Sequence, residues 1–284
     1  MSRVIDPQGL EKKVIFYVPS PAVFPISITG KRCELGCPHC DGKFLESMNP
    51  ATMPPDVIRA FDTAKAGGAK CVLISGGFSR KGKLPIEGMI SAIREGKART
   101  GLKVEVHSGV VEDSTIKALG QAGVDALLLD VIGDDITISE YLGGRWSVAD
   151  YRKVLKSAKE VIPVIAAHVL IGIDRGKIRG EYNAIDIISE ANVDSCALLV
   201  LIDEVVPDPM EVERLMTYAR EKLTNLHLTL GCMRGKGSNR QLYEIMAIDI
   251  GLDGIANPSR ETVEYALAKK RQIINENGCC FFCP

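Results

Sequence analysis

The sequence predicts an α/β protein whose parallel strands close into a single (β/α)8 barrel of the TIM type. Short runs of β-branched and other apolar residues alternate with amphipathic segments rich in Ala, Lys and Glu along most of the 284 residues. Continuous apolar strands separated by helices are typical of a parallel sheet covered on both faces. Several of the helical segments end in glycine before the next strand, at Gly67-Gly68, Gly101, Gly123 and Gly251, and glycine is the usual residue after a helix C-terminus.

Eight strands are expected, because each is a short, mostly apolar run that follows a turn or a glycine. In chain order they are Ile26–Thr29, Cys71–Ser75, Lys103–His107, Ala126–Asp130, Val164–Ile171, Cys196–Ile202, His227–Leu230 and Gly254–Ala256. Helices are expected between them, where apolar residues recur at helical spacing among charged ones. These are Pro55–Ala66, Glu87–Thr100, Ser114–Ala122, Val148–Glu160, Ala184–Ala191, Pro209–Lys222 and Ser238–Ile250. In a barrel, the loops that follow the strands converge at one end, where active sites lie.

No linker, internal repeat or low-complexity tract divides the chain. We therefore expect one domain, with an N-terminal lead-in at residues 1–25, a barrel at residues 26–268 and a C-terminal tail at residues 269–284. A two-domain α/β protein is the alternative.

The composition favours a soluble protein of the cytoplasm. Hydrophobic residues make up 46% of the chain and charged residues 25%, which is ordinary for globular proteins. A formal net charge of −1 provides no basic field for nucleic acid or an anionic membrane, so neither is an expected partner. The apolar stretch near the N-terminus is interrupted by Pro19, Pro21 and Pro25, which excludes a transmembrane span there, and no signal segment precedes it.

Three cysteines with C-x3-C-x2-C spacing carry the strongest functional signal. Cys33, Cys37 and Cys40 follow the first predicted strand on one short loop. Three thiolates leave one iron of a [4Fe–4S] cluster without a protein ligand, and a small molecule can coordinate there. A zinc site is the alternative, but it would need a fourth ligand, and His39 would have to complete it within a cramped loop.

This loop resembles the cluster loop of the radical S-adenosylmethionine (SAM) superfamily. The resemblance implies the barrel type of that superfamily, a [4Fe–4S] cluster, and SAM chelated at the open iron through its amino and carboxylate groups. It also implies that the glycines of Ser75-Gly76-Gly77 let the backbone approach the methionine part of SAM, and that His39 packs beside adenine.

Further SAM contacts follow only from the resemblance. Ser108, after the third strand, is expected to contact SAM, while Glu105 and His107 are candidates for structural roles. Arg152 is expected to bind the SAM carboxylate, with Arg145 as an equal alternative. Phe78 stands where the superfamily usually carries an acid. The segments His168–Ile173 on the fifth strand and Leu199–Ile202 on the sixth resemble adenine-binding strands, although plain barrel core would look the same.

A second group of cysteines lies toward the C-terminus. Packing does not readily explain three cysteines within five residues, because adjacent exposed thiols oxidise readily. We expect them to hold an auxiliary [4Fe–4S] cluster together with a cysteine after the seventh strand, and a frayed tail with redox-prone thiols is the alternative. The predicted ligands are Cys232, Cys279, Cys280 and Cys283, whereas Cys71 and Cys196 lie within apolar strands and are interpreted as core residues.

The segment around Arg234, with the following helix and strand, is similar to biotin synthases, where an arginine near this position meets the auxiliary cluster. The cysteine-rich tail is more similar to the archaeal-type two-component lipoyl synthases, which use two related radical SAM subunits. That resemblance implies a sulfurtransferase that inserts sulfur from an auxiliary cluster into a protein-bound octanoyl chain. The implied partners are an octanoylated lipoyl-carrier protein or octanoyl-lysine peptide, a related radical SAM subunit and a low-potential electron donor.

Two other functions remain open from the residues. One is a radical SAM mutase or cofactor-maturation enzyme whose auxiliary cluster is structural. The other is a non-catalytic iron–sulfur carrier or sensor, which would need no SAM site.

Overall fold

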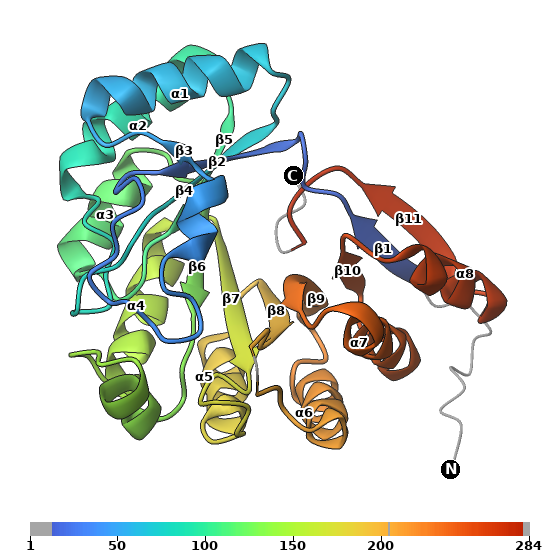
Figure 1. The fold of residues 1–284 in the computed structure, drawn as a ribbon. Coiled ribbons are helices and arrows are strands. Elements are labelled where there is room, and N and C mark those ends of the chain that lie inside the picture. The colour runs from blue at the N-terminus through green and yellow to red at the C-terminus, as the bar shows by residue number, and fades with distance from the viewer. Residues whose placement is uncertain (1–12, 204, 281–284) are drawn as a thin grey trace.

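A computed structural model of the chain describes residues 13–203 and 205–280. One curved sheet forms the centre of the described chain, and helices cover its convex side (Figure 1). Every pair of neighbouring strands in this sheet is parallel. The strands are β1 (Lys13–Tyr17), β2 (Val23–Ser27), β3 (Asn49–Pro50), β4 (Cys71–Ser75), β5 (Lys103–His107), β6 (Ala126–Asp130), β7 (Val164–Ile171), β8 (Ser195–Val200), β9 (His227–Arg234), β10 (Gly254–Ala256) and β11 (Gln272–Glu276).

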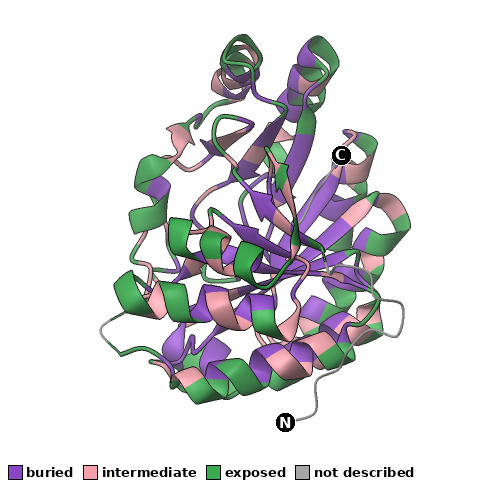
Figure 2. Cartoon of the chain, turned by 90° about the vertical axis from the view of Figure 1, so that its right-hand side faces the viewer, coloured by how far each residue is buried: buried purple, intermediate pink, exposed green. Residues whose placement is uncertain are grey.

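Helices connect most successive strands. The α-helices are α1 (Pro54–Ala66), α2 (Ile90–Thr100), α3 (Asp113–Gln121), α4 (Val148–Val161), α5 (Glu181–Ala191), α6 (Pro209–Lys222), α7 (Gly237–Ile250) and α8 (Arg260–Ala268). Short 3-10 turns lie at Lys43–Ser47 (η1) and Glu87–Met89 (η2), and a π turn lies at Thr137–Tyr141 (η3). Figure 2 shows buried residues on the strands and exposed residues on the outer faces of the helices. No helix among the described residues is long and apolar enough to cross a membrane.

The predicted α/β class and parallel barrel-type architecture are confirmed, but the sheet is a curled half-barrel rather than a closed barrel. Its strand order is β11-β1-β10-β9-β8-β7-β6-β5-β4-β2-β3, so β11 and β3 form its two edges. The eight predicted strands correspond to β2, β4, β5, β6, β7, β8, β9 and β10. The prediction missed β1, β3, β11 and α8, and β1 places part of the expected lead-in inside the sheet.

Alternation along the strands separates the two faces of the sheet. In β4, Val72 and Ile74 pack into the main core toward the helices, whereas Leu73 and Ser75 face the inside of the curve. This period of two is the expected geometry of a strand. Because both faces are covered, the strand reads as a continuous apolar run, which is why the sequence predicts it as parallel.

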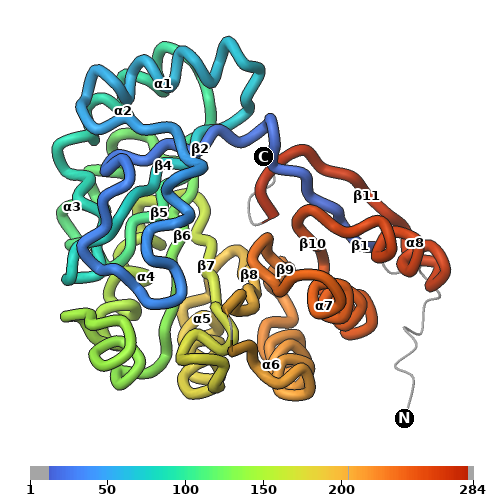
Figure 3. Tube along the Cα trace, in the orientation of Figure 1, coloured from blue at the N-terminus to red at the C-terminus, as the bar shows by residue number. Residues whose placement is uncertain are grey.

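The segment after β11 enters the concave side of the sheet (Figure 3). Cys280 packs there against Tyr17, Ala197 and Ala256, which come from β1, β8 and β10. Cys279 and Cys280 are 8% and 5% exposed. The tail up to Cys280 therefore packs inside the curve of the sheet, which disagrees with the alternative of a frayed tail for the described residues.

A buried ion pair joins β9 to α7. The guanidinium of Arg234 donates to Oε1 of Glu244 from Nε (3.0 Å) and Nη2 (2.6 Å), and both side chains are at most 1% exposed. Arg234 also donates to the backbone carbonyls of Gly231 (2.7 Å) and Asn257 (2.9 Å). These contacts hold the guanidinium within the protein. Arg234 also lies close enough to Cys280 to act to lower the pKa of that thiol, although burial raises it overall. Its role at an auxiliary cluster stays a prediction.

Glu244→Ala should lower the free energy of unfolding by about 3–5 kcal/mol, because it leaves the Arg234 charge buried without its partner. The measurement is guanidinium-induced unfolding. The control is Glu264→Ala, which removes a solvent-exposed pair with Arg260 and should cost at most about 1 kcal/mol. Equal losses for the two variants would contradict the assignment.

The same pair predicts a pH dependence of stability. Burial acts to raise the pKa of Glu244, but hydrogen bonds from Thr262, Arg240 and Ser259 and the charge of Arg234 lower it from 4.5 to about 2. A carboxyl whose pKa falls on folding stabilises the folded state above its unfolded pKa. The stabilisation should therefore be complete above about pH 4.5 and be lost as the pH falls toward 2.

Candidate functional site

A cavity of about 520 Å³ lies on the concave side of the sheet. Residues from the loop after β2, from the segment after β4, from the ends of β5 and β6 and from β7 and β9 line it. They include most of the residues that the sequence singled out, namely Cys33, Cys37, Cys40, His39, Ser75, Gly76, Gly77 and Cys232. The loops that follow the strands thus converge on one site, as predicted for a barrel.

The cysteine loop is held in place by the segment after β4. The backbone N–H groups of Glu34 (3.1 Å) and Leu35 (3.0 Å) donate to the carbonyl of Phe78, and the Cys33 thiol lies 3.8 Å from the same oxygen. The N–H of Gly77 donates to Oγ1 of Thr29 at 2.6 Å. These bonds fix the start of the cysteine loop relative to the sheet.

Gly77 is required by the close approach of this loop. A Cβ atom at this position would lie 2.0 Å from the carbonyl oxygen of Arg32 and 2.5 Å from Cα of Cys33. Both are backbone atoms, so neither can yield as a flexible side chain would. The sequence predicts that this backbone approaches a ligand closely, and the structure shows a close approach to the cysteine loop. The approach to SAM stays a prediction.

Gly77→Ala should displace the cysteine loop and weaken its retention of iron about tenfold, since overpacking costs about 1–3 kcal/mol. Gly88→Ala is a matched control, because a Cβ atom there meets nothing within 4 Å. Iron retained against a chelator after anaerobic reconstitution measures the difference. If both variants retain iron equally, the steric argument at Gly77 is wrong.

The three thiols of the loop are electrostatically coupled. Burial, followed by the neighbouring Cys33 and Cys40, raises the pKa of the Cys37 thiol to about 12. Three thiolates this close repel one another unless a cation lies between them, and metal ions bind thiols in the deprotonated form. The donor set therefore fits an iron–sulfur cluster.

His39 lies within the same cavity. Its ring stacks on Tyr141 with the ring centres 6.1 Å apart and the planes 15° apart. Burial lowers the pKa of His39, which favours the neutral ring. Its Nδ1 is buried without a hydrogen-bond partner among the described residues, so it is available to a ligand.

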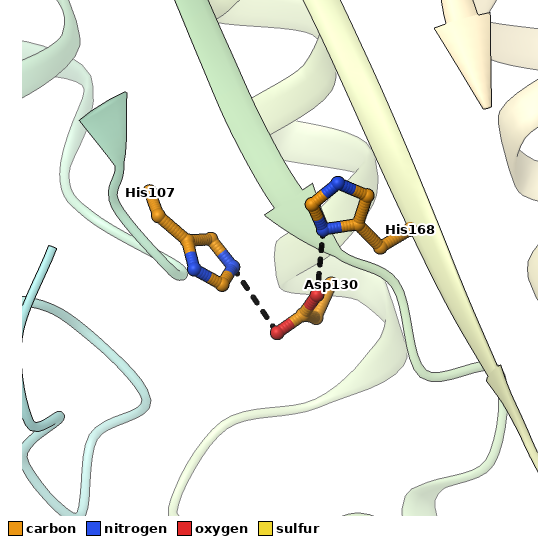
Figure 4. A group of neighbouring side chains, drawn as sticks. All are labelled: His107, Asp130 and His168. Atoms are coloured by element: carbon orange, nitrogen blue, oxygen red, sulfur yellow. Dashed lines mark hydrogen bonds and ion pairs between the residues drawn. The ribbon is translucent and has the colours of Figure 1, made fainter. Parts of the chain in front are cut away.

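Two histidines and one aspartate also line the cavity, and Figure 4 shows them side by side. Oδ2 of Asp130 lies 3.1 Å from Nε2 of His107, and Oδ1 lies 3.0 Å from Nδ1 of His168. The three side chains come from β5, β6 and β7, and their ligand atoms lie within 4.8 Å of one another. Each carboxylate oxygen therefore meets a different imidazole, which fixes the orientation of Asp130.

This cluster places an ionised carboxylate inside the cavity. Burial acts to raise the pKa of Asp130, but His107 and His168 hold it well below its usual range. Burial lowers the pKa of His107, yet Asp130 outweighs it and the net shift is upward. A fixed carboxylate in a largely apolar cavity can accept hydrogen bonds from hydroxyl or ammonium groups, and the three side chains together could bind a metal ion.

Two predicted SAM contacts lie elsewhere. Ser108 is fully buried, and its Oγ donates to the carbonyl of Gly109 at 2.9 Å rather than lining the cavity. Arg152 lies on α4, is 44% exposed and pairs with Glu190 of α5. Ser108 follows β5 and Arg152 follows β6, as the resemblance implies. However, the Ser108 side chain is buried in the core, and the Arg152 side chain is exposed to solvent.

The predicted auxiliary ligands are divided between two environments. Cys232 is exposed and lines the cavity, whereas Cys279 and Cys280 are buried in the barrel interior. Cys232 and Cys280 lie close enough for Cys232 to raise the pKa of the Cys280 thiol, after the larger effect of burial. Cys283 lies outside the described residues.

Asp130 is the main residue that sequence reasoning missed. It is the last residue of a correctly predicted strand, and the two histidines were noted on neighbouring strands but assigned other roles. The sequence signal was that His107 and Asp130 end neighbouring predicted strands and that His168 lies on the next strand. The register that pairs His168 with Asp130 was decided by the structure. Polar residues at the carboxyl ends of adjacent parallel strands meet at one edge.

Comparisons with known proteins agree with this geometry. The family described as "Radical SAM superfamily" matches residues 27–183, which include the cysteine loop and the His107–Asp130–His168 cluster. A search of curated protein sequences found no match. Among solved structures, methylornithine synthase (PylB) is similar with a TM-score of 0.58 and 12% identity, over 89% of this chain and 75% of that one.

Two other similar structures are longer proteins. HydG, a maturase of the [FeFe]-hydrogenase, has a TM-score of 0.61 and 13% identity over 94% of this chain. Streptococcus suis SuiB bound to S-adenosylmethionine has a TM-score of 0.55 and 18% identity over 82% of this chain. The chain spans 61% of HydG and 49% of SuiB. At these identities the likeness concerns the fold.

Proposed function

The chain belongs to the radical SAM superfamily, and on that basis we propose that it binds a [4Fe–4S] cluster through Cys33, Cys37 and Cys40 and cleaves SAM reductively. The observation that carries this proposal is the cysteine loop, which is fixed at the wall of a 520 Å³ cavity by Gly77 and Phe78. When bound, the reduced cluster and SAM supply a 5′-deoxyadenosyl radical.

The chain's own residues orient SAM and exclude water. Asp130 accepts hydrogen bonds from the polar groups of SAM, and His107 and His168 keep its carboxylate charged and correctly turned. Nδ1 of His39 offers a further polar contact, and Ser75-Gly76-Gly77 presents backbone groups. These roles replace those expected for Ser108 and Arg152.

The reaction that we propose is sulfur insertion into an octanoyl chain on a protein lysine during lipoyl assembly. Apolar side chains support it, because Leu73, Leu170, Leu199 and Met233 line the cavity and suit an alkyl chain. The sulfur would come from an auxiliary cluster bound by the cysteines of the C-terminal segment and Cys232. The partners that we propose with this reaction are an octanoylated carrier protein, a related radical SAM subunit and an electron donor, and the proposed location is the cytoplasm.

The test is anaerobic turnover with labelled sulfide in the auxiliary cluster. Octanoyl-lysine peptide should gain labelled sulfur and lose hydrogen, read by mass spectrometry, with and without a related partner subunit. The auxiliary cluster should degrade as product forms. If the peptide stays unchanged in both cases while another substrate loses hydrogen to the deoxyadenosyl radical, sulfur insertion is wrong and a mutase or maturation role takes its place.

A further inference from the structure

The described residues that line the cavity include no lysine or arginine. They include two carboxylates, Asp130 and Glu181. Glu181 is already satisfied within the protein, because its oxygens accept from the backbone N–H groups of Gly172 and Arg179, each at 2.8 Å. A carboxylate of a bound ligand therefore depends on hydrogen-bond donors other than lysine and arginine.

Tyr151 brings a hydroxyl group to the cavity from helix α4. The buried face of this helix consists of Tyr151, Val154, Leu155 and Ala158, which have the spacing of one side of a helix. Tyr151 is 3% exposed and lines the cavity, whereas the side chain of the next residue, Arg152, is 44% exposed. The residue at the cavity wall is thus one position before the arginine that the resemblance assigns to the SAM carboxylate.

The indole of Trp146 holds the Tyr151 hydroxyl in place. Its Nε1 donates to the Tyr151 oxygen at 3.0 Å. The indole packs against glycines of two loops, since a Cβ atom at Gly82 would lie 2.6 Å from the ring and one at Gly144 would lie 2.1 Å from it. Trp146 and Cys37 also pack against the same small apolar cluster. The Trp146–Tyr151 pair therefore lies on the side of the cavity that carries the cysteine loop.

The proton of the Tyr151 hydroxyl has no acceptor. An indole N–H can only donate, so the Tyr151 oxygen is the acceptor in this pair and its own O–H stays available. That O–H donates to no acceptor among the described residues. Burial raises the pKa of Tyr151, and the hydrogen bond from Trp146 offsets only part of that shift, so the hydroxyl keeps its proton at neutral pH. Because a buried donor without an acceptor is costly, packing alone does not account for this hydroxyl.

We propose that the Tyr151 hydroxyl donates a hydrogen bond to the methionine carboxylate of SAM. The inference rests on the SAM binding of the proposed function and assigns the contact that Arg152 does not make. Asp130 and Tyr151 line one cavity as a hydrogen-bond acceptor and a donor. The ammonium and hydroxyl groups of SAM suit Asp130, and its carboxylate, as the anionic acceptor, suits Tyr151. Trp146 is a positioning residue, because it acts through Tyr151.

The test compares SAM with decarboxylated SAM, which lacks only the carboxylate. Both ligands are titrated against the oxidised, reconstituted full chain, so that binding is measured without turnover. Tyr151→Phe should weaken the binding of SAM about tenfold, because it removes a hydrogen bond to a charged group. It should leave the binding of decarboxylated SAM unchanged. The preference of the protein for SAM over decarboxylated SAM should therefore fall by the same factor.

Two further variants separate this contact from a general effect on the fold. Trp146→Phe keeps an aromatic ring but removes the Nε1 donor, and it should lower the preference for SAM by a smaller factor than Tyr151→Phe does. Tyr243→Phe is the matched control, because Tyr243 is also buried and its hydroxyl has no partner among the described residues, but it does not line the cavity. It should leave the binding of both ligands unchanged. If Tyr151→Phe loses the cluster, the SAM preference of Trp146→Phe decides.

The outcomes separate this inference from the proposed function. Equal losses of affinity for SAM and decarboxylated SAM, or no loss for either, overturn the carboxylate contact. Weaker binding of octanoyl-lysine peptide with unchanged binding of SAM would assign the hydroxyl to the substrate and also overturn it. If the unaltered protein binds neither SAM nor its decarboxylated form, the proposed function fails and this inference fails with it. A loss specific to SAM, with no labelled product from octanoyl-lysine peptide, supports the contact and overturns sulfur insertion only.

Discussion

The chain in which Cys33, Cys37 and Cys40 are all replaced by alanine should form no 5′-deoxyadenosine from SAM. Thiolates are the protein ligands of [4Fe–4S] clusters, and no other described cysteine shares the loop of these three. Without them the open iron that SAM would chelate does not form at the cavity wall. Product formation by the anaerobically reconstituted and reduced protein, followed by liquid chromatography, measures the effect.

The control is Cys196→Ala, which removes a buried thiol far from the loop in sequence and on the outward face of β8. It should reduce stability by a cavity term and leave 5′-deoxyadenosine formation per bound cluster intact. Undiminished cleavage by the triple variant would refute the assignment of these cysteines. Equal loss in the control would point to folding rather than ligation.

Asp130→Asn should weaken SAM binding about 10- to 100-fold while leaving the iron content of the first cluster unchanged. Hydrogen bonds to a charged group contribute about 1.5–3 kcal/mol, and each 1.4 kcal/mol is about tenfold in affinity. The asparagine amide keeps the volume but loses the charge that His107 and His168 orient. Equilibrium binding of SAM to the oxidised, reconstituted protein measures the change without requiring turnover.

Two further variants define the role of the His107–Asp130–His168 side chains. His107→Gln should weaken SAM binding less than Asp130→Asn, because the carboxylate would keep His168 as a partner. Asp113→Asn, on the exposed side of α3, should have no effect. SAM affinity that is the same in Asp130→Asn and the unaltered protein would remove Asp130 from the SAM site. Dependence of binding on an added divalent ion would indicate instead that the three side chains bind a metal.

Local patterns in the sequence were enough to predict most of the fold. Apolar runs identified the strands from β2 to β10 except the two-residue β3, because strands buried on both faces need continuous apolar residues. Glycine C-caps were also readable, since Gly101 and Gly251 adopt left-handed φ angles of 69° and 87°. The edge strand β11 was missed because it carries the polar and charged residues Gln272, Asn275 and Glu276. β1 was missed although Val14–Tyr17 is an apolar run, because the N-terminal residues were interpreted as a lead-in.

The cysteine loop and Gly77 were predictable from sequence because ligand spacing and backbone freedom are local properties. Tertiary structure alone decided which side chains meet across the sheet. Asp130 lies in the site because the strand register aligns it with His168. Arg152 lies outside the site because its helix directs the side chain toward Glu190. Cys71 and Cys196 have the same local setting and differ only in the face of the sheet that they occupy. Whether a side chain belongs to the site depends on which residues from distant segments it contacts. The sequence of a single segment does not specify those contacts.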